Sequence, residues 1–305
     1  MPSPLFAEEL AHYGPDQRQA GAPSLAASRA YCRGLARRHY ENFSVASMLL
    51  PRRLRSHFHA VYAYCRWADD LADEIGDPAR SLRLLDWWEE QLDECYAGRA
   101  THPVFVSLDA TISQFSIPAE PFRDLLTAFR QDQRIARYET RDDLLGYCRN
   151  SAHPVGRLVL YLGRCHDQPR AVLADNICTG LQLANFCQDV ARDWQRGRIY
   201  LPLEDCRRHG YREPDFAAAC CDERFRRLLA AEVSRAEGYL RAGLPLVERV
   251  PRFLRGDVWL FAQGGLAILD QIRRVNYDVW SHRPVVTRGK KLRLLAGCVW
   301  RNCRG

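Results

Sequence analysis

The sequence predicts an all-α protein, and three observations support this. From about Ser24 onward, apolar residues recur three and four positions apart, which is the period of an amphipathic helix. No run of residues alternates between apolar and polar side chains, as a half-buried strand would. Helix-breaking residues fall between the periodic segments, at Gly76-Asp77-Pro78, Gly163, Gly197, Gly210 and Pro251.

The elements can be placed from the same pattern. The clearest helical segments are residues 81–98, 120–138, 141–163 and 223–250. Residues 1–22 contain Gly14-Pro15 and lead into Pro23, so we expect them to form a loose N-terminal extension. No linker rich in Ser, Gly or Pro divides the rest of the chain. Residues 23–305 are therefore predicted to form one domain.

Composition excludes several classes of protein. The chain has 305 residues, 47% of them hydrophobic and 27% charged, which is typical of a globular protein. The N-terminus lacks a signal-peptide pattern, and no apolar run approaches the roughly 18 residues of a membrane span. We expect a cytoplasmic, non-spanning protein.

The net charge of +7 is diffuse and comes without a nucleic-acid motif, so nucleic acid is not an expected partner. The twelve cysteines show no C-x-x-C pair or zinc spacing, which predicts reduced thiols.

The most basic segment is the C-terminal tail. Arg288, Lys290, Lys291 and Arg293 flank or interrupt the apolar stretch LRLLAGCVW. Two interpretations remain open. The tail can be an amphipathic helix that lies on the inner, anionic face of a membrane as a peripheral contact, or a terminal helix that packs on the core.

The stretch YCRWADDLADE places four carboxylates after an apolar run without a turn signal. On one helix, Asp69 and Asp73 share a face, with Cβ atoms about 5–6 Å apart. Two like charges at that distance repel, which calls for a solvated face, a basic partner or a bound cation. Asp70 and Glu74 point away from this face, so we expect them to be solvated.

A second polar row lies in LQLANFCQDVARDWQ. It consists of Gln182, Asn185, Asp189 and Asp193, at offsets of three, four and four. On one helix these side chains share a face, and burying them would be costly unless they bind ligands. Each row alone fits a solvated helix face. Together, the two rows offer hard oxygen ligands at one-turn spacing, which favours a Mg²⁺ site shared with substrate phosphates.

Three segments, YAYCRWADDLADE, YCRNSAHPVGRLVL and NFCQDVARDWQRGRIYLP, resemble the squalene/phytoene synthase family. The resemblance runs from about His39 to Leu295. It implies a single-domain isoprenoid synthase, a helical bundle around a central cavity, whose members join two prenyl diphosphates head to head. Within the family, HYENFSVASMLLP, PVGR and GGLAILDQIRRVNYDV are similar to the bacterial hydroxysqualene synthases of hopanoid-producing pathways.

Two departures from the wider family concern the substrate. Tyr40-Glu41-Asn42-Phe43 stands where many members carry Ser-Lys-Ser-Phe or Ser-Arg-Ser-Phe, which puts an acid where a base often meets diphosphate. Gly264-Gly265 stands where some relatives have a bulkier residue. Both departures argue against farnesyl diphosphate as the substrate.

The resemblance also implies roles for individual residues. Those that would hold Mg²⁺ are Asp69, Asp73, Asn185, Asp189 and Asp193, and the four aspartates would also be catalytic. Those that would bind substrate are Tyr62, Arg66, Gln182, Arg198, Tyr200 and Arg283. Tyr147 would lie beside the reacting carbons, where its hydroxyl can pass a proton and its ring can face a carbocation. Plainer interpretations stay open: Arg66 as an ion-pair partner of Asp69 or Asp73, and both Tyr62 and Tyr147 as core tyrosines. We assign no role to His153.

The leading hypothesis is a Mg²⁺-dependent enzyme that converts presqualene diphosphate to hydroxysqualene, without a nicotinamide cofactor. An alternative within the family is condensation of farnesyl diphosphate to presqualene diphosphate or squalene. A non-catalytic assembly or binding protein is the alternative of another class, although both aspartate rows are intact. A metal-dependent phosphohydrolase is disfavoured, because the nine histidines lack the usual His-Asp spacing. Enzymes of squalene and hopanoid biosynthesis are the expected partners.

Overall fold

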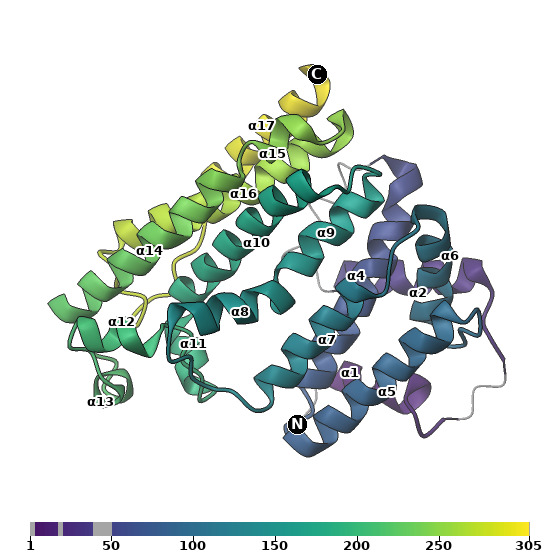
Figure 1. The fold of residues 1–305 in the computed structure, drawn as a ribbon, viewed down its shortest axis with the longest axis horizontal. Coiled ribbons are helices and arrows are strands. Elements are labelled where there is room, and N and C mark those ends of the chain that lie inside the picture. Colours follow the sequence, from purple (N-terminus) through teal and green to yellow (C-terminus); the bar gives the residue numbers. More distant parts are fainter. Residues whose placement is uncertain (1–3, 18–20, 39–50, 305) are drawn as a thin grey trace. The chain divides into compact units, whose positions relative to one another are not determined.

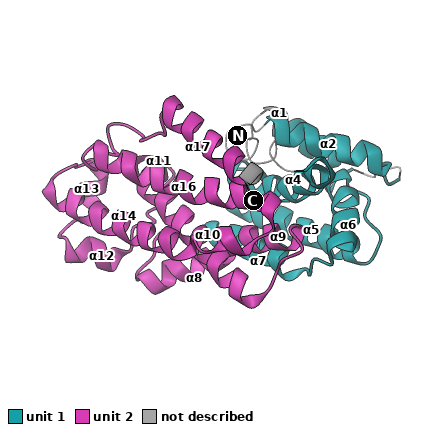
Figure 2. Cartoon of the chain, turned by 90° about the horizontal axis from the view of Figure 1, so that it is seen from above, with its two compact units in different colours: residues 1–134 teal, residues 135–305 magenta. Residues whose placement is uncertain are grey.

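The computed structural model describes residues 4–17, 21–38 and 51–304, with the backbone alone for residues 302–304. All regular elements within these ranges are helices (Figure 1), and one isolated bridge pairs Arg137 with Ile199. The prediction of an all-α fold is confirmed. The chain divides into two compact units, Met1–Arg134 and Ile135–Gly305 (Figure 2).

Unit 1 is built around one long helix. Its helices are α1 (Pro4–Tyr13), α2 (Leu25–Arg38), α4 (Arg52–Asp73), α5 (Pro78–Tyr96), α6 (Pro103–Phe115) and α7 (Glu120–Asp132). Helix α4 contacts α2, α5, α6 and α7. Its buried Trp67 stacks on Trp88 of α5 at 5.1 Å, and Trp88 lies 4.5 Å from the Phe105 ring of α6. The Tyr64 hydroxyl donates to the carbonyl of Phe122 at 2.9 Å, which ties α7 to the same core.

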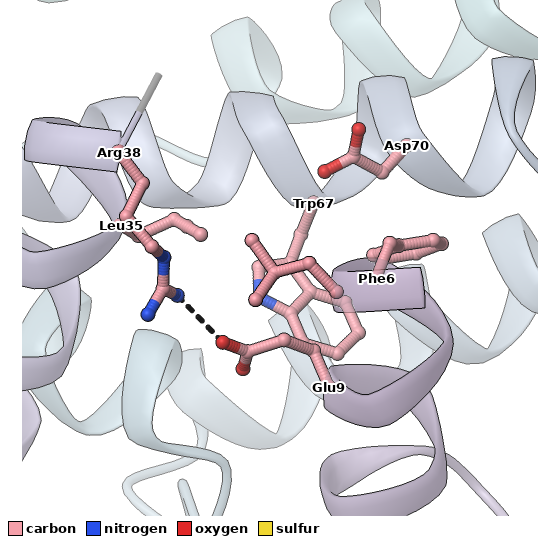
Figure 3. A pocket seen from close by; sticks show the side chains of 7 residues that line it. Phe6, Glu9, Leu35, Arg38, Trp67 and Asp70 are labelled. Carbon is pink, nitrogen blue, oxygen red and sulfur yellow. Dashed lines mark hydrogen bonds and ion pairs between the residues drawn. The ribbon is translucent and has the colours of Figure 1, made fainter. Parts of the chain in front are cut away.

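The N-terminal segment contains a packed helix. Phe6 of α1 is 5% exposed and meets the Trp67 ring edge-on at 5.4 Å. Glu9 accepts a hydrogen bond from the Tyr31 hydroxyl and pairs with Arg38 at 2.6 Å (Figure 3). Residues 4–13 are therefore held by apolar and ionic contacts within unit 1, unlike the loose extension that the sequence suggested. The division of the chain into residues 1–22 and 23–305 stays a prediction.

Unit 2 is organised by a pair of long helices. Its helices are α8 (Arg141–Ser151), α9 (His153–Leu162), α10 (Gln168–Gln188), α11 (Val190–Gln195), α12 (Leu203–Arg208), α13 (Glu213–Ala217), α14 (Glu223–Gly243), α15 (Leu246–Arg249), α16 (Arg252–Arg274) and α17 (Arg288–Arg304). Glycines allow α10 and α14 to approach closely. A Cβ on Gly180 would lie 2.8 Å from the backbone nitrogen of Leu240, and one on Gly243 would lie 2.8 Å from the carbonyl oxygen of Leu173. Larger residues at these positions would force the helices apart.

Two expected helical segments are interrupted. The segment 141–163 divides at Ala152 into α8 and α9, and 223–250 divides at Leu244-Pro245 into α14 and α15. Pro154 lies in the first turn of α9, where its missing N–H is tolerated but would break a continuous helix. The predicted boundaries Gly197 and Gly210 are confirmed, and both adopt positive φ values, 75° and 68°. None of the described helices is long and apolar enough to cross a bilayer.

One buried carboxylate of α16 has no basic side chain paired with it among the described residues. Asp257 is 4% exposed, and neither of its oxygens has a hydrogen-bond partner among the described residues. Burial raises the pKa of Asp257 to about 7. Its charge in turn adds to the effect of burial in raising the pKa of Cys298 on α17 to about 12, so Asp257 lies near the packing surface between α16 and α17. An ionised Asp257 should therefore destabilise the folded state.

We expect Asp257→Asn to stabilise the protein relative to wild type, and this gain should be larger at about pH 8 than at about pH 5. A carboxyl whose pKa is raised in the folded state makes a contribution to stability that is fully present at pH values below its ordinary pKa. That contribution is lost as the pH rises through about 7. The gain at the higher pH should lie between about 1 and 4 kcal/mol. Thermal melts of both proteins at the two pH values measure it.

The matched control is Asp270→Asn, which removes a carboxylate from the same helix. The Asp270 side chain is 45% exposed and pairs with Arg274 at 3.2 Å, so its loss should change stability little at either pH. A gain for Asp257→Asn that is equal at the two pH values would contradict the assignment of a buried, ionising carboxyl.

Candidate active site

The first aspartate row lies on α4 as predicted. Tyr62, Arg66, Asp69 and Asp73 are spaced by four, three and four residues and share one face of this helix. The Asp69 side chain is 44% exposed, and Asp73 is exposed. A guanidinium nitrogen of Arg66 lies 3.2 Å from Asp69. The row therefore offers accessible carboxylate oxygens whose mutual repulsion is relieved by an arginine. Tyr62 is half-buried, and burial raises its pKa.

The expectation that Asp70 is solvated was wrong. Asp70 is 3% exposed and receives two hydrogen bonds from Arg66, one of them from Nε at 3.0 Å. Phe6 of α1 and Leu35 of α2 line the same small pocket and cover this side of α4 (Figure 3). Burial raises the pKa of Asp70 to about 7, although Arg66 opposes that rise. Glu74 lies 3.6 Å from the same guanidinium, so Arg66 joins three carboxylates on one helix.

The second row crosses a junction between two helices. Helix α10 ends at Gln188 and α11 begins at Val190, whereas the sequence suggested one continuous helix. Two i to i−4 bonds nevertheless bracket the junction. The Asp189 amide donates to the Asn185 carbonyl and the Asp193 amide donates to the Asp189 carbonyl, both at 2.9 Å. Asn185, Asp189 and Asp193 therefore remain on one face.

An ion pair holds the centre of this row. Arg283 donates from Nε to one oxygen of Asp189 at 2.5 Å and from Nη2 to the other at 2.9 Å. The same Nη2 lies 3.2 Å from Oε1 of Gln188, whose amide nitrogen donates to the Pro284 carbonyl at 2.5 Å. The pair is bidentate, which is the strongest common geometry for these two groups. Asp189 is 9% exposed, so Arg283 supplies a positive charge that a buried carboxylate requires.

Four aromatic rings cluster beside the row, namely Tyr138, Tyr147, Phe186 and Tyr200, and all are buried. Phe186 stacks on Tyr200 with centroids 4.1 Å apart, and Tyr147 lies 5.8 Å from Tyr200. Tyr138 lies 5.4 Å from Tyr147 and 5.8 Å from Tyr200. Tyr138 was not among the expected site residues, because it is the last residue of the expected helical segment 120–138 and carries no pattern of its own. The cluster forms an electron-rich wall that can face a cation.

Backbone pairing brings these rings together. The Ile199 amide donates to the Ala136 carbonyl and the Leu203 amide to the Tyr138 carbonyl, both at 2.9 Å. Residues 136–139 therefore run alongside residues 199–204, which places Tyr138 next to Tyr200 despite their separation in sequence.

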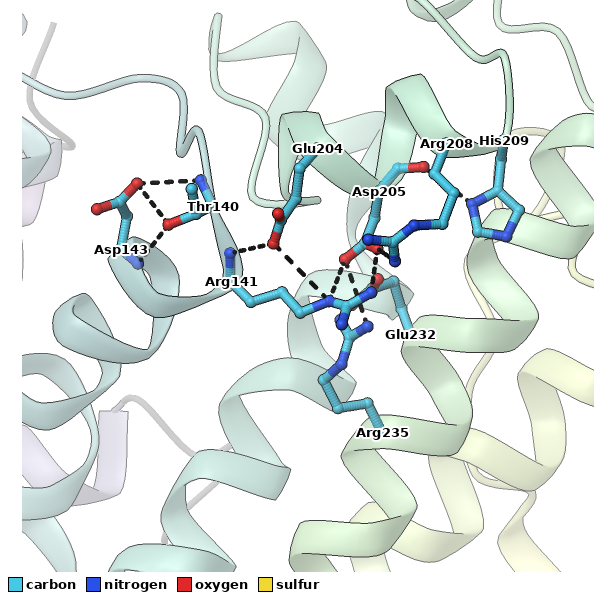
Figure 4. Close-up of polar contacts among 9 residues, drawn as sticks. All are labelled: Thr140, Arg141, Asp143, Glu204, Asp205, Arg208, His209, Glu232 and Arg235. Carbon is cyan, nitrogen blue, oxygen red and sulfur yellow. Dashed lines mark hydrogen bonds and ion pairs between the residues drawn. The ribbon is translucent and has the colours of Figure 1, made fainter.

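A buried ion-pair network supports this arrangement (Figure 4). Asp205 of α12 is fully buried and accepts from Nε of Arg141 at 2.7 Å, from Arg208 at 2.7 Å, and lies 3.3 Å from Arg235. Arg141 begins α8, the helix of Tyr147, and its backbone amide donates to Glu204 at 2.9 Å. The network thus links α8, α12 and α14 beside the strand-like pairing. Sequence reasoning missed it, because LEDCRR looks like an exposed helix.

The arginines of this network balance the charges of its buried carboxylates to different extents. Burial acts to raise the pKa of Asp205, but hydrogen bonding from Arg141 and the charge of Arg235 outweigh it and hold that pKa below its usual value. Glu232 is 3% exposed and pairs with Arg235, yet burial raises its pKa and one of its oxygens has no hydrogen-bond partner among the described residues. Asp205 is therefore the carboxylate whose negative charge the surrounding arginines balance.

The remaining expected residues lie in unit 2 or outside the described residues. Gln182 is half-buried on α10. The Arg198 amide donates to the Asp193 carbonyl at 2.8 Å, directly after α11. Nε2 of His153 lies 2.8 Å from the Thr179 hydroxyl, and its Nδ1 lies 3.4 Å from Asp175. The Tyr40-Glu41-Asn42-Phe43 stretch lies outside the described residues.

The glycines of α16 differ from each other. A Cβ on Gly264 would meet none of the described residues within 4 Å, whereas one on Gly265 would lie 2.9 Å from both Leu181 and Leu240. Gly265 is therefore a packing residue, and Gly264 is not in contact with the described helices in this way.

The two aspartate rows have the donor chemistry that Mg²⁺ requires. Each offers carboxylate or amide oxygens on successive helical turns, and Asp69, Asp73 and Asn185 are accessible to solvent. No group of three or more His, Cys, Asp or Glu side chains forms a metal cage within the described residues. Mg²⁺ does not need such a cage, since it usually takes one or two carboxylates and completes its shell with waters and phosphates. The eleven cysteines in the described part of the chain are free thiols and offer no alternative metal site there.

Comparison with known proteins identifies the family. The model of squalene/phytoene synthases matches residues 36–290, which include both aspartate rows, the aromatic cluster and Arg283. The chain belongs to the squalene/phytoene synthase family. The matched residues contain helix α4 and the α10–α11 junction.

Several members of the squalene/phytoene synthase family are similar over most of their length. The phytoene synthase of Arthrospira platensis is 32% identical over 277 residues, which cover 87% of this chain and 90% of the relative. The 15-cis-phytoene synthase of Synechocystis sp. is 33% identical over 292 residues, covering 91% and 87%. The crystal structure of squalene synthase HpnC from Alicyclobacillus acidocaldarius has 46% identity and a TM-score of 0.80, and the match covers 83% of this chain and 95% of that one. A dehydrosqualene synthase solved with a ligand has 28% identity and a TM-score of 0.82, covering 90% and 96%.

The Arg283–Asp189 pair predicts a specific loss of stability. Arg283→Gln should lower the free energy of unfolding by about 1–3 kcal/mol, because it leaves the Asp189 carboxylate buried without its bidentate partner. Urea denaturation followed by circular dichroism measures the loss. The matched control is Arg274→Gln, since Arg274 is 66% exposed and its ion pair with Asp270 should contribute less than about 1 kcal/mol. Equal effects of the two substitutions would contradict a stabilising role for the Arg283 pair.

Proposed function

We propose that this protein is a Mg²⁺-dependent enzyme that converts presqualene diphosphate to hydroxysqualene and diphosphate. The observation that carries the proposal is its 46% identity to the squalene synthase HpnC, against 32–33% to the phytoene synthases of Arthrospira and Synechocystis. The intact aspartate rows support catalysis over a purely structural role. The Tyr40-Glu41-Asn42-Phe43 stretch supports a substrate other than farnesyl diphosphate.

The proposed reaction begins when the carbon–oxygen bond to diphosphate breaks and the diphosphate leaves with the electron pair. The cyclopropane ring of the substrate then opens to an allylic cation. Water adds its oxygen to that cation and loses a proton, which completes the alcohol. Atoms and charge balance without an oxidant or reductant, so no nicotinamide cofactor is expected.

Different residues of the chain would bind the metal, bind the substrate and transfer a proton in this reaction. Asp69, Asp73, Asn185, Asp189 and Asp193 would hold Mg²⁺, which when bound neutralises diphosphate and assists departure of the leaving group as a Lewis acid. The substrate-binding residues proposed are Tyr62, Arg66, Gln182, Arg198, Tyr200 and Arg283. Tyr147 would supply a hydroxyl that can pass on the proton lost by water, accepting it while donating its own proton onward to solvent or diphosphate.

The buried aromatic cluster extends this proposal. Tyr138, Tyr147 and Tyr200 present ring faces that stabilise a cation without reacting with it. Their burial supports the exclusion of all but one water from a central cavity, since early water would quench the cation before it rearranges.

The names of the curated relatives favour a second candidate. The Arthrospira and Synechocystis proteins are both phytoene synthases, which supports head-to-head condensation of two prenyl diphosphates as the alternative reaction. We also propose that the protein acts in the cytoplasm, beside enzymes of squalene and hopanoid biosynthesis and at the inner face of a membrane.

Product analysis in labelled water tests the leading proposal. We expect the purified protein to turn over presqualene diphosphate with Mg²⁺ alone, and the product formed in ¹⁸O-water to carry the label in its hydroxyl group. Omission of Mg²⁺ and addition of NADPH are the controls, and neither should yield more product. Exclusive formation of squalene with strict dependence on NADPH, or turnover of farnesyl diphosphate only, would reject the proposal in favour of condensation.

Substitution of an accessible aspartate tests the metal assignment. Asp73 is exposed, so Asp73→Asn should leave the fold intact while turnover falls by more than about 100-fold, the upper end for residues that merely support a ligand. Turnover and thermal melts are measured together. Asp142→Asn removes another exposed helical carboxylate and should leave turnover unchanged. Near-normal activity of Asp73→Asn would remove this residue from the site.

A further inference from the structure

A hydroxyl group at the end of α8 is buried without a partner. The side-chain oxygen of Ser151, the last residue of this helix, is shielded from solvent and makes no hydrogen bond among the described residues. Helical hydroxyl groups elsewhere in the chain donate to the carbonyl of the preceding turn, as those of Thr111, Thr127 and Ser234 do at 3.1, 3.1 and 2.8 Å. A buried hydroxyl that does not do so is an exception, and its oxygen is available to a ligand or a water.

Contacts on both sides of Ser151 define what it faces. One turn before it on α8, the Tyr147 ring lies 6.3 Å from the Phe186 ring of α10. Two residues after it, Nε2 of His153 lies 2.8 Å from the Thr179 hydroxyl, which also belongs to α10. The chain around Ser151 therefore runs antiparallel to the part of α10 between these two contacts.

Gln182 lies in the middle of that part of α10. Thr179, Gln182 and Phe186 are spaced by three and four residues, so they share one face of the helix. Tyr147 and Ser151 are four residues apart and share a face of α8 in the same way. Because the residues on either side of them meet, Ser151 lies opposite Gln182, which is half-buried. A hydroxyl and an amide are thus brought together one turn from Tyr147.

We propose that Ser151 and Gln182 bind the water molecule whose oxygen becomes the hydroxyl group of the product. A water inside a protein usually makes about three hydrogen bonds, and a hydroxyl and an amide offer both donors and acceptors for them. The water oxygen forms the carbon–oxygen bond to the allylic cation with one of its lone pairs. The proton that it then loses passes by way of the Tyr147 hydroxyl to solvent or diphosphate. The inference rests on the proposed function, since it assigns residues to the water of that reaction.

A hydroxyl at position 151 suits a reaction that ends in an alcohol. Aromatic rings such as those beside Tyr147 stabilise a cation without reacting with it. A hydroxyl that holds water near the same cation would divert a synthesis whose product is a hydrocarbon, because water quenches the cation. A purely structural role is disfavoured, since the Ser151 hydroxyl bonds to no described part of the chain.

The product mixture of Ser151→Ala tests the proposal. Wild type and variant receive presqualene diphosphate and Mg²⁺, and released diphosphate, alcohol and hydrocarbon are measured. Water adds after ionisation, so diphosphate release should change by less than about twofold. The ratio of alcohol to hydrocarbon should fall about tenfold, the effect of one hydrogen bond, because the cation more often loses a proton and forms a carbon–carbon double bond. An unchanged ratio would overturn the proposal.

Two further variants separate the hydroxyl from the side chain around it. Ser151→Thr keeps the hydroxyl and should keep the alcohol as the main product. The matched control is Ser28→Ala, because the fully buried Ser28 hydroxyl of α2 also has no partner among the described residues. Its loss should leave the product ratio unchanged. Thermal melts check folding, and neither alanine variant should be less stable, since alanine favours a helix and no hydrogen bond within the protein is lost. A threonine variant that forms as little alcohol as Ser151→Ala, or an equal shift in Ser28→Ala, would contradict the assignment.

A crystal structure of the substrate-free protein gives a test that does not depend on turnover. We expect an ordered water within about 3.2 Å of both the Ser151 oxygen and the Gln182 amide, and its loss in Ser151→Ala. A Ser151 hydroxyl that donates to the Tyr147 carbonyl instead would overturn the proposal.

Failure of the inference can be distinguished from failure of the proposed function. Wild-type protein that forms no alcohol from presqualene diphosphate would reject both. Wild-type protein that forms the alcohol, with the same product ratio in Ser151→Ala, would overturn the inference alone.

Discussion

Compensation of buried carboxylates by arginine is the constraint on which much of this structure depends. Asp70, Asp189 and Asp205 are almost completely removed from solvent, and each is met by a guanidinium group. A carboxylate in such a position is tolerated only when its charge is balanced and its oxygens are hydrogen-bonded. Asp257 has no such partner among the described residues, and burial raises its pKa to about 7. At Asp70, Arg66 offsets burial only in part, and the pKa of that carboxyl is also raised to about 7.

The same pairs determine which loops and helices meet in unit 2. Arg283 and Asp189 are 94 residues apart in sequence, and Arg141 and Asp205 are 64 apart. The first pair holds the segment before α17 against the α10–α11 junction, and the second holds the start of α8 against α12. Arginine suits this task better than lysine, because its planar group bonds both oxygens of a carboxylate at once. The nearly complete absence of lysine from the chain is consistent with that use.

Features that depend on helical period alone could be predicted from the sequence. The all-α fold, the shared face of Asp69 and Asp73, and the row from Asn185 to Asp193 all result from spacing. The break at Asp189 could not be foreseen, because the period of the sequence continues through it. The burial of Asp70 could not be foreseen either. It results from α1, a segment whose Gly14-Pro15 suggested a loose chain, and only the tertiary contact of Phe6 with Trp67 reveals its position. Tyr138 and Asp205 likewise owe their places to partners more than 60 residues away.

The two adjacent glycines of α16 differ in how readily a larger residue could replace each of them. Any side chain added at Gly265 would displace Leu181 and Leu240 and disturb three long helices together. A side chain added at Gly264 would enter space that none of the described residues occupies. Position 264 can therefore gain volume by a single substitution while the helix packing is preserved, whereas position 265 can change only in concert with its neighbours.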